Sequence, residues 1–190
     1  MALQPEVQLS LLTAGGVQEP RADWSKTAQA NLASEIESQL KQRSHGLKML
    51  EADSVMEGRT GQLLRLNEAV GQSILLFGYA IKLPSKGKEF DWTLGEGAKA
   101  LGEVQGADFA LFINARGTYA SGGRIATAIG LSMLGVSVPL GQQVVLASLV
   151  DLKTGRVVWF NVAVAGPNAD MRKPEGAAEL TTSLLKNIPL

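Results

Sequence analysis

The sequence predicts a three-layer α/β domain, in which a mixed sheet of about five strands lies between helices and ends in a C-terminal antiparallel hairpin. Segments typical of strands and of helices alternate through the first part of the chain. Two β-branched runs then flank the polar turn Lys153, Thr154 and Gly155, a pattern typical of a hairpin. Both runs, in residues 144–165, are apolar at almost every position, so we expect two central strands covered by helices on both faces.

Length and composition favour one globular domain over residues 1–190. The chain has 190 residues, of which 45% are hydrophobic and 19% charged, so it can bury a large core. Lys and Arg total 18, as do Asp and Glu, and this zero net charge makes a nucleic-acid partner unexpected. The chain has no cysteine, which excludes disulfides, thiol nucleophiles and cysteine metal sites.

The first half of the chain predicts two strands and two helices. Residues 7–12 alternate apolar and polar side chains, as in a strand. A helix is expected from Asp23, a good N-cap, to residues 44–46, followed by a short strand at residues 47–50. Residues 58–83 predict a second helix with two internal glycines, which indicate close packing or a break. The apolar stripe of the first helix consists of Trp24, Ala28, Leu32, Ile36 and Leu40.

The second half predicts a helix, a strand, the hairpin and a final helix. The helix is expected at residues 94–104, closed by Gly106, and the strand at residues 108–119. The sharpest bend of the hairpin is expected at Gly155, because glycine adopts positive φ at low cost. Pro174 is placed to begin the last helix, whose apolar side carries Leu180, Leu184 and Ile188.

Residues 125–141 are the least ordinary part of the sequence, because they carry no charge. The first part of this segment is expected to be a helix, and Pro139 ends any regular element. Three interpretations remain open: burial in the core, the most common fate of apolar residues; an interface with a second copy or another protein; or insertion into a bilayer. The interface candidates are Ile125, Ile129, Met133, Leu134 and Val136.

No catalytic constellation stands out. The chain has one histidine, His45, whose place after a helix favours a structural or surface role. Residues 95–100 match a loose form of the dinucleotide fingerprint but lack a clear strand before them. Asp108 and Asp151 lie near strand ends, where we favour backbone capping over catalysis or metal binding. No metal ligand set or cofactor is therefore expected.

A loop rich in hydrogen-bond donors is the most plausible ligand site. Arg116, Tyr119, Ser121 and Arg124 follow or end a strand, and glycines lie among them. Such a loop at a strand end can hold an anion. A small-ligand or nucleotide-binding domain that uses residues 95–100 or 116–124 is therefore the alternative function, and such a domain could be an enzyme.

The pattern of residues 95–188 resembles a group of bacterial envelope proteins. A helix ends in Gly106, Ala107 and Asp108, an apolar strand follows, and the hairpin carries Asp-Leu-Lys-Thr-Gly-Arg-Val-Val-Trp at residues 151–159. This is similar to the curli-secretion-channel lipoproteins, the penicillin-binding-protein activator lipoproteins and the amino-terminal domain of the Tol translocation protein. The resemblance implies a periplasmic α/β domain, often tethered to the outer membrane by a lipidated cysteine, that acts through protein contacts.

These observations predict a non-catalytic cell-envelope module that binds other proteins in envelope or secretion-complex assembly. Other envelope proteins are the expected partners, and self-association through the apolar segment is a further expectation. The first residues do not read as a signal peptide, and the chain has no lipidation cysteine, so membrane contact is expected only through an anchor absent from this sequence. The expected location is the periplasm, with a cytoplasmic domain left open.

Overall fold

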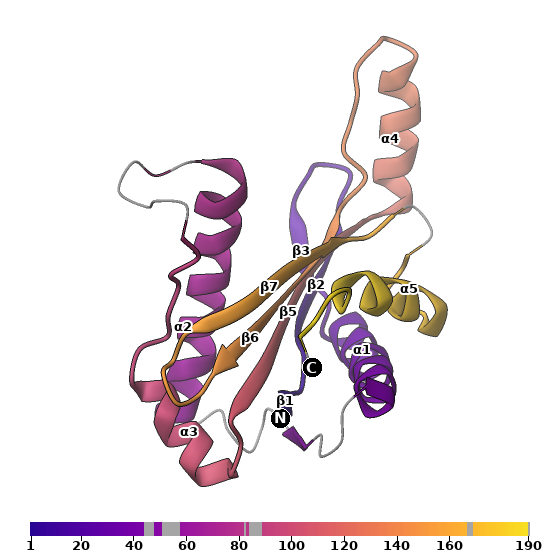
Figure 1. The fold of residues 1–190 in the computed structure, drawn as a ribbon. Coiled ribbons are helices and arrows are strands. Elements are labelled where there is room, and N and C mark those ends of the chain that lie inside the picture. The colour runs from indigo at the N-terminus through magenta and orange to yellow at the C-terminus, as the bar shows by residue number, and fades with distance from the viewer. Residues whose placement is uncertain (44–47, 51–57, 82, 84–88, 167–168, 190) are drawn as a thin grey trace.

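The computed structural model describes residues 1–43, 48–50, 58–81, 83, 89–166 and 169–189. Within them, seven strands form one mixed sheet with helices on both faces, which confirms the α/β sandwich (Figure 1). His45 and the expected end of the first helix at residues 44–46 lie outside the described residues.

The central strand of the sheet is β5. It pairs in parallel with β2 and β1 and antiparallel with β6, and β6 in turn pairs with β7. The order across the long strands is therefore β3, β2, β5, β6, β7, with β4 beside β1. The strands are β1 (Ala2–Leu3), β2 (Glu6–Leu12), β3 (Gln18–Pro20), β4 (Met49–Leu50), β5 (Phe109–Ala120), β6 (Gln143–Asp151) and β7 (Val157–Val164).

Two helices cover each face of the sheet. On one face lie α1 (Ala22–Arg43) and α5 (Pro174–Leu184), and on the other lie α2 (Gly58–Ile74) and α3 (Gly97–Gln105) (Figure 1). The predicted stripe of α1 is confirmed for Ala28, Leu32, Ile36 and Leu40, which are all fully buried. Its first member, Trp24, is partly buried against the same core. Side chains alternate between the two faces along each strand, so β5 sends Leu111 and Ile113 to the α1 side.

The glycines of the second predicted helix mark both close packing and a break. Gly71 lies against the sheet, and a Cβ there would be 3.7 Å from the Phe160 ring. Gly78 lies in a π-helical turn, η2 (Leu75–Ala80), which continues from α2. The α-helix thus ends sooner than the periodicity predicted, and a wider turn takes over.

The hairpin prediction is correct for the turn and for one strand. Asp151 forms the expected cap, since its Oδ1 accepts the Lys153 N–H at 2.8 Å and its Oδ2 accepts the Thr154 hydroxyl at 2.9 Å. Gly155 has the expected positive φ, 71°. However, β7 pairs only with β6 and lies at the sheet edge, so the expectation of two central strands was wrong for β7. Some of its apolar residues still pack beneath helices: Trp159 and Ala163 join the core on the α1 side of the sheet, and Val157 and Phe160 join the core on the α2 side.

Of the three interpretations left open for residues 125–141, the structure excludes burial in the core. They form α4 (Gly122–Ser132) and a returning segment, which project from the body beyond the end of the sheet (Figure 1). No residue of α4 is buried. The core is complete without this segment, because the two faces of the sheet are already covered by the other four helices.

Candidate functional site

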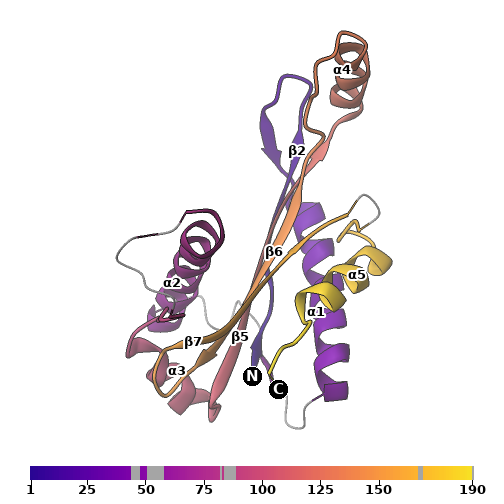
Figure 2. The same ribbon diagram turned by 45° about the horizontal axis from the view of Figure 1, so that its top comes forward.

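The projecting segment, residues 122–141, is the candidate site and is called the arm below. Figure 2 shows it standing clear of the other helices. Met133 and Leu134 at its tip are 81% and 77% exposed. The other interface candidates, Ile125, Ile129 and Val136, are also exposed. Because monomeric proteins rarely expose a contiguous apolar surface of this kind, the arm has the properties of a contact site.

Hydrogen bonds fix the base of the arm to the sheet. The Ser121 N–H donates to the Leu12 carbonyl at 2.9 Å, and the Ser121 hydroxyl accepts the Arg124 N–H at 3.1 Å as the helix N-cap. The Ala120 N–H donates to the Leu140 carbonyl at 3.0 Å, which joins the returning segment to β5. Arg124 Nε donates to the Pro139 carbonyl at 2.9 Å and ties the helix to the returning segment.

The tip of the arm is a closed turn. The Val136 N–H donates to the Leu131 carbonyl and the Gly135 N–H to the Ser132 carbonyl, both at 3.0 Å. Gly135 has a φ of 79°, a left-handed conformation that glycine adopts at lower cost than other residues. The apolar side chains are therefore presented by one helix and a returning segment that hydrogen bonds hold together.

The four residues of the expected anion site do not converge. Arg116 points to the α2 side of the sheet, where its guanidinium pairs with the carboxylates of Glu6, at 3.2 Å, and Glu68. Tyr119 lies on the opposite face, because its position differs by an odd number of residues. The Ser121 hydroxyl caps α4, and the Arg124 side chain bonds the returning segment of the arm. The four residues therefore have separate structural roles.

Tyr119 instead belongs to a stack of rings and guanidinium groups. The Arg172 guanidinium lies 3.6 Å from the Tyr119 ring centroid and 4.5 Å from that of Trp24. Arg21 stacks on Trp24 at 4.3 Å. The Tyr119 hydroxyl donates to Gln143 Oε1. Burial, and secondly the nearby Asp170 carboxylate, raise the pKa of Tyr119 above its ordinary value. The sequence contained no sign of this stack, since it joins residues from β5, α1 and the segment before α5.

Asp170 anchors Arg172 in that stack. The Asp170 carboxylate accepts two hydrogen bonds from the guanidinium, from Nε at 2.9 Å and from Nη2 at 2.8 Å. Burial acts to raise the pKa of Asp170, but the hydrogen bonds from Arg172 outweigh it, and the pKa lies below its ordinary value. The pair therefore stabilises the fold while Asp170 is ionised.

We expect this pair to make stability depend on pH in the acidic range. Since the folded pKa of Asp170 is lowered, its stabilising contribution is present above the unfolded pKa, about 4, and is lost as pH falls through the folded pKa. Thermal unfolding of wild type and of Asp170→Asn at pH 7 and pH 3 measures this. The midpoint difference between the two proteins is expected to shrink at pH 3. An unchanged difference would mean that the charge of Asp170 contributes nothing.

The dinucleotide-like residues 95–100 do not sit in the context that a nucleotide site requires. Within the described residues, the backbone before them makes one isolated bridge, between Thr93 and Arg156, in place of a buried strand. A cavity of about 460 Å³ lies beside Gly97 and Ala100, and its lining includes Leu63, Leu66 and Leu94. Its only charged lining residue is Glu96, and a carboxylate disfavours an anion.

Asp108 has a surface role. It forms an ion pair with Lys153 at 2.7 Å, in which both side chains are exposed.

Within the described part of the chain, no group of three or more His, Cys, Asp or Glu side chains could hold a metal ion. Across the same residues, no helix has both the length and the apolar character needed to cross a membrane.

Comparisons with known proteins give a distant structural likeness. No protein-family model matches this chain, and no curated protein sequence matches it. Among solved structures, the chain is similar to the lipoprotein GNA1162 from Neisseria meningitidis, with 13% sequence identity and a TM-score of 0.33. The match covers 86% of this chain and 78% of that one. At this level the likeness carries no argument about function.

Proposed function

We propose that this protein is a non-catalytic module of the bacterial cell envelope that acts by binding other proteins through its arm. The observation that carries the proposal is the exposed arm, which carries no charge from residue 125 to residue 141 and whose helix α4 has no buried residue. The periplasm is the proposed location, on the pattern of residues 95–188 described above. Other envelope proteins are the proposed partners.

The structure of the arm supports binding over a role in stability. Its apolar side chains lie on several sides of α4, and the segment between Arg124 and the end of the turn carries no charge. Burial of such side chains against a partner is favourable by roughly 25 cal/mol per Å² of apolar surface. A charge placed at the tip would therefore oppose binding strongly while leaving the fold intact.

A site-specific photo-crosslinker tests the location and the contact together. Placed at Met133 in the natural host, it is expected to give discrete adducts with envelope proteins, because Met133 is 81% exposed on the tip. The matched control is Val104 on α3, an apolar residue that is 78% exposed but lies on the body. Recovery of the protein from the cytoplasm, or equal adduct patterns from both positions, would contradict the proposal.

Leu134→Asp is expected to abolish those adducts without unfolding the protein. Leu134 is 77% exposed, so the substitution is expected to change the free energy of unfolding by less than about 0.5 kcal/mol. Val104→Asp introduces the same charge at a site of equal exposure and is expected to leave the adducts in place. Thermal unfolding and crosslinking of both variants measure the two effects separately.

A further inference from the structure

One end of the molecule carries almost no charge. Residues 117–150, which include the arm and most of β6, contain a single charged residue, Arg124 at the base of the arm. Residues 7–18, which include most of β2 and the turn that leads to β3, contain none. The two segments meet where the Ser121 N–H donates to the Leu12 carbonyl. The arm and the neighbouring turn before β3 therefore form one uncharged end of the molecule.

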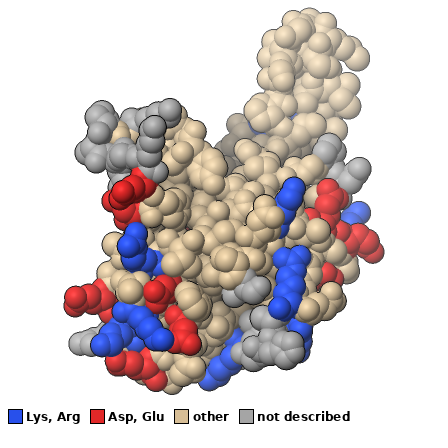
Figure 3. All heavy atoms as spheres, in the orientation of Figure 1, with Lys and Arg blue, Asp and Glu red and all other residues tan. Residues whose placement is uncertain are grey.

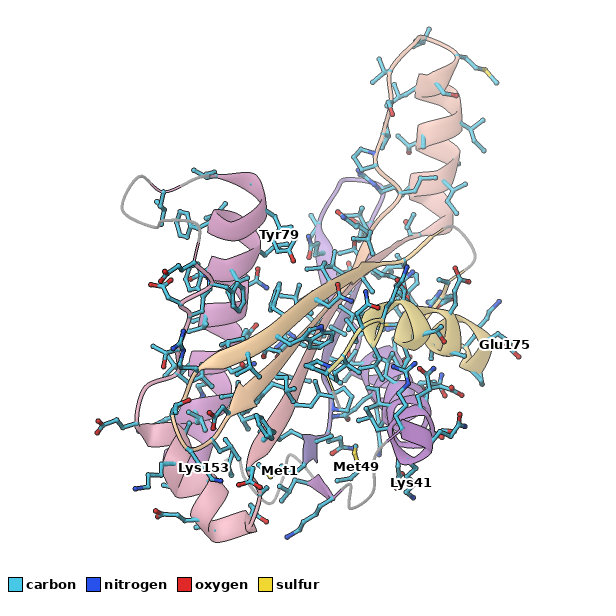
Figure 4. The ribbon with its side chains drawn as sticks, viewed as in Figure 1. Met1, Lys41, Met49, Tyr79, Lys153 and Glu175 are labelled. Atoms are coloured by element: carbon cyan, nitrogen blue, oxygen red, sulfur yellow. The ribbon has the colours of Figure 1, made fainter. Side chains whose placement is uncertain are left out.

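The charged side chains lie on the body instead. In Figure 3 the visible part of the arm beyond its base shows no Lys, Arg, Asp or Glu, whereas charges of both signs are visible on the body. Figure 4 shows Lys41 and Lys153 at the opposite end of the molecule from the arm. A molecule with this division is suited to keep its body in water and its uncharged end in an apolar phase.

Apolar side chains are exposed on both limbs of the arm. Ile125, Ile129 and Met133 follow one another at steps of four along the helix and its end, and all three are exposed. On the returning segment, Val136 and Leu140 are each 49% exposed. A globular partner covers the side that it touches and leaves the other sides in water, whereas a bilayer surrounds an inserted segment on all sides. The distribution of apolar side chains therefore favours a bilayer.

Polar groups near the tip are already paired within the arm. The N–H groups of residues 134–136 donate to the carbonyls of residues 131 and 132, at 2.9 to 3.0 Å. The hydroxyls of Thr127 and Ser132 donate to carbonyls of the helix backbone, at 2.9 and 2.7 Å. Contact with water or with a polar protein surface does not require such pairing, but hydrocarbon does, because it cannot bond an open donor.

The size of the arm suits a shallow insertion. Its helix has 11 residues and is roughly 16 Å long, about half of the roughly 30 Å hydrocarbon core, so the arm can enter a bilayer and cannot cross it. Interfacial segments typically enter by about 5 to 10 Å. At that depth the tip reaches the acyl chains, while the backbone of Ser137 and Val138 stays among headgroups and water. Arg124, bonded to the Pro139 carbonyl at the base, lies on the headgroup side.

We propose that the uncharged end inserts into the surface of a lipid bilayer, with residues 133–136 among the acyl chains. This inference goes beyond the proposed function, because it adds a lipid contact to the protein contacts of the arm. The two are compatible, since an arm held in a membrane meets proteins that lie in the same membrane. Because the inserted residues carry no charge, binding does not depend on anionic lipids.

A single dye at the tip tests the insertion. The chain has no cysteine, so Met133→Cys provides one attachment site for the environment-sensitive dye NBD, and Val104→Cys provides a matched site on α3. With purified protein and phosphatidylcholine vesicles, the emission from position 133 is expected to increase and to shift to shorter wavelength. The emission from position 104 is expected to stay unchanged. Added phosphatidylglycerol and a change of salt concentration are expected to leave the affinity the same.

Leu134→Asp is expected to weaken vesicle binding about tenfold or more, measured by flotation, because its carboxylate would have to enter the acyl chains. Val104→Asp places the same charge on the body and is expected to float as the wild type does. Both replaced side chains are exposed, and thermal unfolding checks that each variant folds.

Several results would overturn the inference. One is a wild type that does not bind vesicles, and another is binding that needs phosphatidylglycerol and is lost at high salt, which indicates adsorption of the charged body. A dye response at both positions, or a response at position 133 that needs no vesicles and grows with protein concentration, also excludes it; the latter assigns the arm to a second copy. Vesicle binding without protein adducts at Met133 supports this inference and removes the proposed function, and adducts without vesicle binding do the reverse.

Discussion

Gly155→Ala is expected to lower the free energy of unfolding by about 3 kcal/mol or more. Gly155 has a φ of 71°, which costs an alanine roughly 1 to 2 kcal/mol. A Cβ at this position would also lie 2.1 Å from the Gly95 carbonyl oxygen, closer than any real contact, so the backbone must move. The Gly155 carbonyl accepts the Leu94 N–H at 2.8 Å, so that movement disturbs the entry to α3 as well.

Gly95→Ala provides a control with the same backbone conformation. Gly95 has a φ of 72°, but no atom lies within 4 Å of its Cβ position. This variant is therefore expected to lose only the conformational term, about 1 to 2 kcal/mol. Thermal unfolding should separate the two variants, with a fall in midpoint on the order of 10 °C for Gly155→Ala and a smaller fall for Gly95→Ala. Equal midpoints would show that the close approach between the two loops does not matter.

The contrast between Gly155 and the rest of the hairpin shows what the sequence could predict. The turn is local: Gly155, Thr154 and Asp151 lie within five residues, so the turn and its cap could be predicted from the sequence. The position of β7 at the edge was not, because the strand order depends on pairings between distant segments. An apolar strand can be buried either between two neighbours or beneath helices that cover an edge strand, and both give the same pattern of residues.

For the candidate site, too, the sequence predicted the local features and missed those that depend on tertiary packing. It identified the uncharged segment and its apolar residues, but it could not show whether they are buried or exposed, because that depends on how the other elements pack. Arg116 and Tyr119 do not meet because they are an odd number of positions apart on β5 and so point to opposite faces of the sheet. Ser121 and Arg124 lie beyond the strand, where they bind groups at the base of the arm. The stack around Arg172 was missed because Trp24 and Tyr119 are far from it in sequence.

That stack leads to a second large expected effect, in Arg172→Ala. The substitution removes a guanidinium that contacts two rings and pairs with Asp170 through two hydrogen bonds. The Asp170 carboxylate would keep its charge in a partly buried site without its partner. We expect a loss of about 2 to 3 kcal/mol in the free energy of unfolding, measured by denaturant titration.

Arg172→Lys separates the charge from the planar geometry. Lysine keeps the positive charge but cannot stack a planar group on the Tyr119 and Trp24 rings or form the paired hydrogen bonds, so about half of the loss is expected to remain. Arg156→Ala is the surface control, since that side chain is exposed, and is expected to cost under about 0.5 kcal/mol. Full rescue by lysine would reduce the role of Arg172 to its charge. Arg172→Ala and Arg156→Ala could instead lower the free energy of unfolding equally. In that case the stack does not hold the segment before α5 against the sheet, and the packing of α5 depends on its own apolar face.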